Sequence, residues 1–124
     1  MVVSFRSLDS ENNKIEYISE AEQVEDYIEF EDKSCFDTKI RLKIENGIAE
    51  FIRFGFISMS IKFQLNKITP GAYVNAEGLD FEFEIYTTEL QIEKDKFSVR
   101  YNMIMDNNVI SKHFIQIAFF KNLA

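Results

Sequence analysis

The side chains best suited to acid–base chemistry are scarce in this sequence. His113 is the only histidine, and so the only side chain whose ordinary pKa lies near neutrality. It is therefore the natural general base, if there is one. His113 is separated from Ile115, Ile117 and Phe119 by even numbers of residues, so in a strand all four side chains point to the same face. This predicts that His113 faces the apolar side of the last strand, near one end. The alternative is a histidine hydrogen-bonded at the rim or exposed beside Lys112.

A second candidate is Arg53, a charge inside one of the most apolar stretches of the chain. It is flanked by Phe51, Ile52 and Phe54. A guanidinium that points into a protein interior needs an anionic partner, and the carboxylate of a bound ligand would serve in a bidentate pair. The alternative is a structural ion pair with a carboxylate of the protein itself, with the arginine stem lying along apolar surface.

The remaining polar residues argue against most catalytic chemistry. Glu82 and Glu84 alternate with phenylalanines, so we expect them to share the solvated outer face rather than to act as an acid–base pair. One histidine and one cysteine, Cys35, are too few nitrogen and sulfur ligands for a zinc site. Glycine-rich phosphate loops and nucleophile elbows are absent from the sequence. The sequence therefore predicts no catalytic residues, no metal and no cofactor.

Charge and composition narrow the class of protein further. The chain has 124 residues with 21 acidic against 14 basic side chains, a net charge of −7, which argues against nucleic acid as a partner. The acidic run from Glu16 to Asp32 is interpreted as a solvated face. We find no signal-peptide pattern and no apolar run long enough to span a membrane, and a lone Cys35 suits a reducing compartment. These features predict a cytoplasmic protein that does not bind membranes.

The elements that must position the candidates are strands. Apolar and polar residues alternate with a period of two, the pattern of a half-buried strand, along much of the chain. The alternating runs are 39–45, 58–65, 79–92 and 97–105, and the shorter runs 2–8 and 14–18 are predicted to form an opening hairpin. In the run 79–92 the apolar parity changes at Leu90, which predicts a β-bulge near Thr87, Thr88 or Glu89.

Short turn sequences separate these runs and predict antiparallel neighbours. Asn46-Gly47 is a strong hairpin signal, and Asp106-Asn107-Asn108 is similar. Residues 93–96 are predicted to connect two further strands, and Thr69-Pro70-Gly71 is predicted to form a type II turn. Segment 19–29 has two interpretations, because Ser19 to Glu22 fits a helix capping box, although strand is favoured for most of 23–31.

Eight to ten short strands in one domain, residues 1–124, suggest a closed barrel or a two-sheet sandwich. A set of short motifs, in order along most of the chain, resembles the YwiB-like proteins, a family of small bacterial proteins of about this length. The motifs are Thr38 to Gly47, Arg53-Phe54-Gly55, Met59 to Phe63, Tyr73, Gly78-Leu79, Thr88 with Leu90, Tyr101-Asn102-Met103 and Ser111-Lys112-His113. The match departs at Glu20 to Glu29, which is short and lacks the usual glycine.

The resemblance implies an all-β, calycin-like (lipocalin-like) up-and-down antiparallel barrel, and it implies no reaction. By analogy with lipocalins, a small apolar or anionic ligand inside the barrel is the first functional hypothesis. Its candidate contacts are Arg53, His113 and three hydroxyl residues that carry the resemblance, Tyr73, Thr88 and Tyr101. The alternative is a structural or interaction module without ligand, for example a homodimer formed through an exposed apolar strand at 115–120. Phenylalanines that fill the barrel themselves would favour this alternative.

Overall fold

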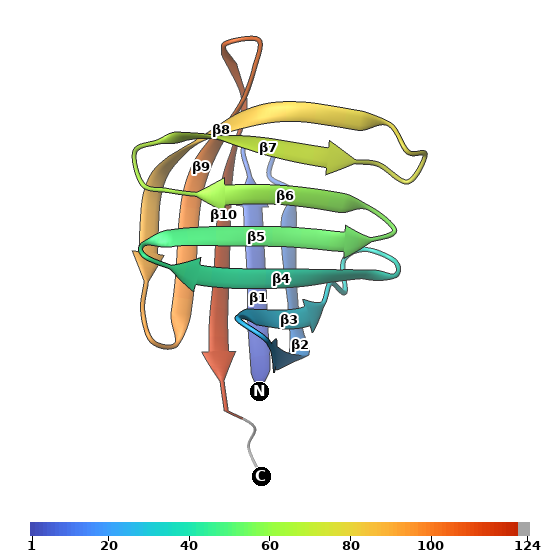
Figure 1. Cartoon of the computed structure of the whole chain (residues 1–124), viewed down its shortest axis with the longest axis vertical. Coiled ribbons are helices and arrows are strands. Elements are labelled where there is room, and N and C mark those ends of the chain that lie inside the picture. Colours follow the sequence, from blue (N-terminus) through green and yellow to red (C-terminus); the bar gives the residue numbers. More distant parts are fainter. Residues whose placement is uncertain (122–124) are drawn as a thin grey trace.

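The computed structural model describes residues 1–121 as ten antiparallel strands that close into one barrel (Figure 1). Around the barrel the strands follow the order β1-β10-β9-β8-β7-β6-β5-β4-β3-β2, so each strand pairs with its neighbours in the chain and β1 closes onto β10. This confirms the predicted all-β, up-and-down barrel. The strands are β1 Val2–Asp9, β2 Lys14–Val24, β3 Tyr27–Glu31, β4 Thr38–Glu45, β5 Ile48–Gly55, β6 Ser58–Phe63, β7 Ile68–Val74, β8 Asp80–Ile92, β9 Lys96–Met105 and β10 Asn108–Phe120.

The turn predictions are confirmed at three connections. Asn46 and Gly47 have φ of 54° and 74°, and Asp106 and Asn107 have φ of 51° and 64°, as expected for two-residue turns with both central residues at positive φ. Residues 93–95 connect β8 to β9 as predicted. The ambiguous segment 19–29 is strand on both sides of a tight turn at Glu25, so the helical alternative is wrong.

The prediction of a type II turn at residues 69–71 is wrong, because these residues lie inside β7. Proline lacks the N–H that a central strand needs. Pro70 is accommodated because pairing of β7 with β6 ends at Gly71, opposite Ile61. The Thr69 hydroxyl then donates a hydrogen bond to the Lys62 carbonyl, 2.5 Å away, so the side chain replaces a ladder bond.

The predicted β-bulge is confirmed, and it decides which threonine faces the core. The register of β8 against β9 shifts between Thr87 and Glu89. Thr87 is wholly buried opposite Tyr101, whereas Thr88 is exposed and donates a hydrogen bond to the Arg100 carbonyl. The extra residue therefore turns Thr88 to the outside of the barrel.

Phenylalanine fills most of the barrel interior. Each of the buried rings is at most 8% exposed, and neighbouring rings pack in tilted or stacked contacts 5.0 to 6.3 Å apart. The buried rings are Phe5, Phe30, Phe51, Phe63, Phe83 and Phe97. Gly71 makes room for one of them, because a Cβ there would collide with the ring of Phe83. The rings therefore occupy much of the space that a ligand would need.

The barrel is flattened, with β3 to β7 crossing in front of β1, β2, β9 and β10 at a steep angle (Figure 1). The segment 115–120 is not an exposed apolar strand, because Ile115 and Ile117 are buried and β10 pairs on both sides. Loops 10–13, 32–37, 56–57, 75–79 and 106–107 share one end of the barrel, which we call the Arg53 end. Among residues 1–121 there is no helix of the length and apolar character needed to cross a bilayer.

Candidate functional site

Arg53 points into the barrel from β5. It has the same parity as Ala49 and Phe51, which are wholly buried, and its own side chain is 19% exposed. Its Nε atom lies 2.9 Å from Oδ2 of Asp32, whose side chain is completely buried. The protein itself therefore supplies an anionic partner for the guanidinium, which is the structural alternative that the sequence left open.

Asp32 is held from its other side by the loop that follows β3. The backbone N–H of Ser34 donates to Oδ1 over 3.0 Å, and the Ser34 hydroxyl donates to the same oxygen over 2.5 Å. Oδ1 is thus saturated, and Oδ2 is left to face Arg53. These contacts fix the carboxylate in one orientation.

The interpretation of the run 16–32 as a solvated face is wrong at two positions. Asp32 is 1% exposed, and Glu29 is 7% exposed with ion pairs to Lys39 and Arg41. The sequence does contain a signal for Asp32, because it shares the parity of Phe30, a core residue of β3.

Tyr17 of β2 adds a phenol to this pair, and it was not singled out from the sequence. Its ring stacks on Phe5 with centroids 5.0 Å apart. Burial raises the pKa of the Tyr17 hydroxyl strongly and the Asp32 carboxylate raises it further, while the positive charge of Arg53 opposes both. Tyr17 is thus a neutral hydroxyl beside the ion pair at any physiological pH.

The hydrogen-bonding capacity of this cluster is not used up. Tyr17 Oη, Asp32 Oδ2 and Arg53 Nε are all buried, and none has a well-aligned hydrogen-bond partner within residues 1–121. Arg53 Nε and Asp32 Oδ2 form an ion pair at 2.9 Å, although the N–H is not aligned well enough for a regular hydrogen bond. We call Tyr17, Asp32 and Arg53 the polar cluster.

The charge of the Arg53 guanidinium also affects the pKa of Tyr101, on β9. Burial raises the pKa of Tyr101 to about 12, and the charge of Arg53 acts to lower it. The Tyr101 ring packs 5.0 Å from Phe63 and stacks on His113, with centroids 4.9 Å apart and ring planes 15° apart. The charge of Arg53 therefore acts to lower the pKa of both Tyr17 and Tyr101.

His113 is half-buried and shares the inward face of β10 with Ile115 and Ile117. Its Nε2 lies 2.7 Å from the Ser111 hydroxyl and shares a hydrogen bond with it. Burial lowers the pKa of the imidazole, against the opposing charge of Asp9. His113 is therefore held as a neutral ring behind Tyr101.

The other two candidates lie farther from Arg53. Tyr73 is half-buried on β7, two strands away in the same row of paired residues, because Arg53 pairs with Met59 and Met59 with Tyr73. Its ring lies 6.1 Å from that of Phe81. Thr88 is on the outer face and apart from the polar cluster. The structure thus places Tyr73 on the same row as Arg53, whereas Thr88 lines a hollow of about 410 Å³ together with Tyr101 and His113.

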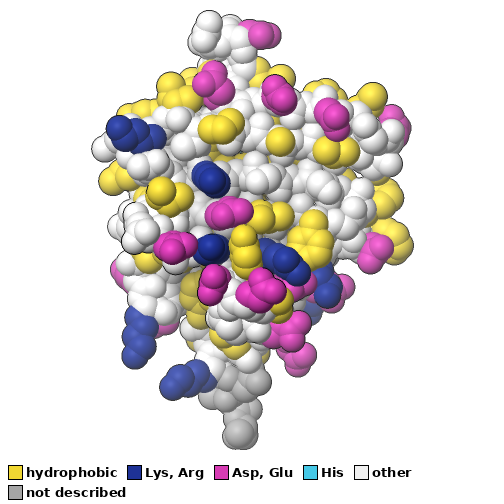
Figure 2. Space-filling view, viewed as in Figure 1, with side chains coloured by type: hydrophobic (Ala, Val, Ile, Leu, Met, Phe, Trp, Pro, Cys, Tyr) yellow, Lys and Arg dark blue, Asp and Glu magenta, His cyan; other side chains and the backbone are white. Residues whose placement is uncertain are grey.

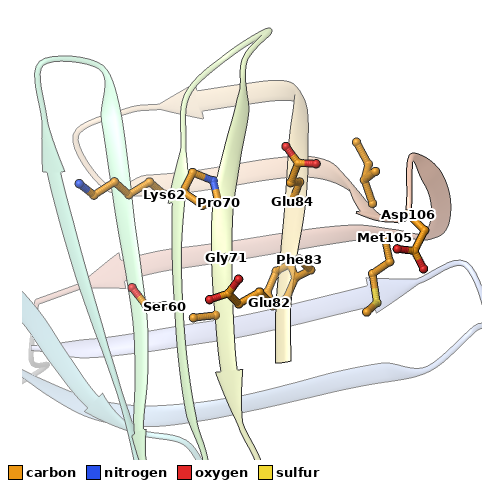
Figure 3. A pocket seen from close by; sticks show the side chains of 11 residues that line it. Ser60, Lys62, Pro70, Gly71, Glu82, Phe83, Glu84, Met105 and Asp106 are labelled. Carbon is orange, nitrogen blue, oxygen red and sulfur yellow. The ribbon is translucent and has the colours of Figure 1, made fainter. Parts of the chain in front are cut away.

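Surface hollows lie on the outside of the barrel. One of about 580 Å³ runs over β6, β7 and β8 to the β9–β10 turn, lined by Lys62, Glu82, Glu84 and Asp106 among others (Figure 3). Glu82 and Glu84 are exposed there, as predicted. The outer face mixes acidic, basic and apolar side chains (Figure 2). Within the described residues no three His, Cys, Asp or Glu side chains are grouped to hold a metal ion.

Comparison with known proteins agrees with the resemblance drawn from the sequence. The barrel is similar to the crystal structure of the ywiB protein from Bacillus subtilis, with a TM-score of 0.63 and 15% sequence identity over 97% of this chain and 91% of that one. At this identity the likeness shows the fold alone. No curated protein matches the chain. The family model described as a domain of unknown function, DUF1934, matches residues 3–117, and the chain belongs to that family.

Proposed function

We propose that this protein is a binding barrel that takes a small ligand at the Arg53 end, with a polar head on the polar cluster. The observation that carries the proposal is the group of three buried polar atoms, Tyr17 Oη, Asp32 Oδ2 and Arg53 Nε, without aligned partners. A buried polar atom with no partner at all costs about 1–3 kcal/mol. The ion pair offsets part of this cost for Arg53 and Asp32, and the Tyr17 hydroxyl lies beside Asp32, so the cluster has hydrogen-bonding capacity that water or a ligand could use.

The charges of the cluster favour one kind of head group. Asp32 already neutralises Arg53, so a ligand carboxylate would gain from the guanidinium but would be repelled by the buried Asp32. A neutral head that both donates and accepts hydrogen bonds, such as an amide or an alcohol, matches a phenol, a carboxylate and an N–H without adding charge.

The apolar part of the ligand would lie among side chains on the same row of the barrel. Met59 and Tyr73 are half-buried, and Phe81 is 44% exposed. Because phenylalanine rings already fill the interior, the ligand must be small or must displace one of these flexible or exposed side chains.

The proposal is tested by native mass spectrometry of gently purified protein, followed by titration with a short primary amide and the carboxylic acid of equal chain length. Tyr17→Phe removes the unpartnered hydroxyl while keeping the ring that packs on Phe5. Tyr27→Phe is the matched control, because Tyr27 lies beside Lys43 and Arg41 rather than in the polar cluster.

We expect the wild type and Tyr27→Phe to bind the amide more tightly than the acid, and Tyr17→Phe to lose about tenfold in affinity. Wild-type protein that carries no extra mass and binds neither compound would overturn the proposal. If Tyr17→Phe bound the amide as tightly as the wild type, the polar cluster would not be the binding site.

A further inference from the structure

Within residues 1–121, one edge of strand β2 is not covered by another strand over part of its length. It pairs with β1 from Lys14 to Glu20, but it pairs with β3 only from Ala21 to Val24. After Phe30, the chain leaves β2 and enters the loop that leads to β4. Residues 14–20 therefore have a strand neighbour on one side only.

The phase of the ladder shows which residues point to the free side. The Ala21 N–H donates to the Met1 carbonyl over 2.8 Å, and at the other end the Asp9 N–H donates to the Asn13 carbonyl over 3.2 Å. In an antiparallel pair the bonded residues recur every second position, so the odd-numbered residues of β2 bond to β1. Lys14, Glu16, Ile18 and Glu20 must then direct their N–H and C=O groups away from β1.

Side chains along this edge are accessible. Ile18 is 64% exposed, and the side chains of Lys14 and Glu16, which form an ion pair with each other at 3.2 Å, are 55% and 51% exposed. A hollow of about 660 Å³ lies where β2 and β3 diverge, and Ser19, Glu20 and Glu31 are among the residues that line it. The Glu20 carbonyl accepts the Ser19 hydroxyl at 3.3 Å, a local contact in place of a ladder bond.

Two exposed aromatic rings pack against each other in the loops that follow β3 and β5. Phe36 is 78% exposed and Phe56 is 51% exposed, and the two pack edge to face with centroids 5.7 Å apart. Phe36 belongs to the loop that begins at Asp32, whose carboxylate acts on Tyr17 of β2. The described residues thus expose both unpaired backbone groups on β2 and an apolar pair in the loops, two kinds of surface that partners use.

We infer that the free edge of β2 pairs antiparallel with β2 of a second copy of this chain. A two-fold dimer brings the same surface of each copy together, so the edge must complement itself. With Tyr17 at the centre, Glu16 lies opposite the partner's Ile18, and Lys14 lies opposite the partner's Glu20. The N–H and C=O groups of all four even-numbered residues then face those of even-numbered residues of the partner, so they can form hydrogen bonds.

Charge selects this register over its neighbours. Two neighbouring registers also keep even-numbered residues opposite even-numbered residues. One of them places Glu16 opposite the partner's Glu16, and the other places Glu16 opposite the partner's Glu20. Like charges directly opposite each other are unfavourable, so both registers are disfavoured. In the selected register two Lys–Glu pairs flank the centre.

The test is sedimentation equilibrium of the full chain over a wide concentration range, together with amide hydrogen exchange by NMR. Ile18→Pro removes one edge-facing N–H and leaves the bonds to β1 intact, because proline is tolerated where the N–H faces outward. Ile18→Thr is the matched control, since it changes the side chain and keeps the N–H. Thermal unfolding of each variant checks that the barrel is intact.

We expect a concentration-dependent dimer whose dissociation constant rises about tenfold or more in Ile18→Pro and only slightly in Ile18→Thr. The amides of Glu16, Ile18 and Glu20 should gain protection as the dimer forms, while that of Tyr17 is protected throughout. Lys14→Glu should weaken the dimer, and Lys14→Glu with Glu20→Lys should restore it.

A chain that stays monomeric at the highest concentration, with rapid exchange at Glu16 and Ile18, would overturn the inference. So would a dimer that Ile18→Pro leaves unchanged, because another surface would then hold it. If these amides become protected only when an extended peptide of another protein is added, the edge belongs to that partner instead. None of these outcomes depends on a small ligand.

Discussion

The two ends of the barrel interior are built differently. Away from the Arg53 end the interior is mostly apolar, and Val3, Ala49, Phe63, Phe97 and Ile117 are completely buried. At the Arg53 end the interior holds a charged pair, two phenols and a histidine. Tight apolar packing stabilises the folded state, whereas paired buried polar groups add little net stability and unpaired ones are strongly destabilising. The apolar end therefore carries more of the packing that stabilises the fold, and the polar end is where we propose that a ligand binds.

The largest effect should come from a cavity at the apolar end. Phe97→Ala removes a wholly buried ring that packs 6.3 Å from Phe63, and we expect it to lower the free energy of unfolding by about 3–5 kcal/mol. Urea denaturation measures this, with Phe36→Ala as the control because Phe36 is 78% exposed. Equal losses in the two variants would contradict the contrast between core and surface.

The polar end should respond to charge balance rather than to volume. Arg53→Met leaves the buried Asp32 without its counter-charge, which we expect to lower the free energy of unfolding by about 3 kcal/mol. Arg53→Met combined with Asp32→Asn removes both charges and should recover most of the loss. A double-mutant cycle by urea denaturation measures the coupling, and additive effects would show that the pair does not interact.

Tyr17→Phe tests whether the polar end contributes to stability at all. Its hydroxyl is buried without an aligned partner, so its removal should leave the free energy of unfolding unchanged or raise it, within about 1 kcal/mol. A loss well above that would mean that the hydroxyl is hydrogen-bonded in solution and is not free for a ligand.

The smallest effect should be a pH dependence from His113. Burial lowers its pKa in the folded state, so below the ordinary value of 6.5 the unfolded chain binds more protons than the folded one. His113 should therefore lower the free energy of unfolding as the pH falls from 6.5 towards its folded-state pKa. NMR titration of the imidazole and urea denaturation at several pH values measure this, and His113→Gln should remove the histidine component.

Much of the fold could be predicted because β-structure is encoded locally in this chain. Alternation located most of the strands, and Asn46-Gly47 identified a hairpin turn. The parity change before Leu90 located the bulge at Thr87–Glu89. The turn predicted at Pro70 was wrong, because a proline also fits a strand whose neighbour has ended, and that depends on a distant segment.

For the site, the sequence by itself determined that Arg53 is a charge within an apolar stretch and that His113 shares the face of Ile115. Only the tertiary structure decided what they meet. Tyr17, Asp32 and Arg53 belong to β2, the loop after β3, and β5, and they come together only when the barrel closes. The free edge of β2 is likewise decided by where β3 leaves it. Period-two patterning sets which face a side chain takes, whereas register and closure set its neighbours across the barrel.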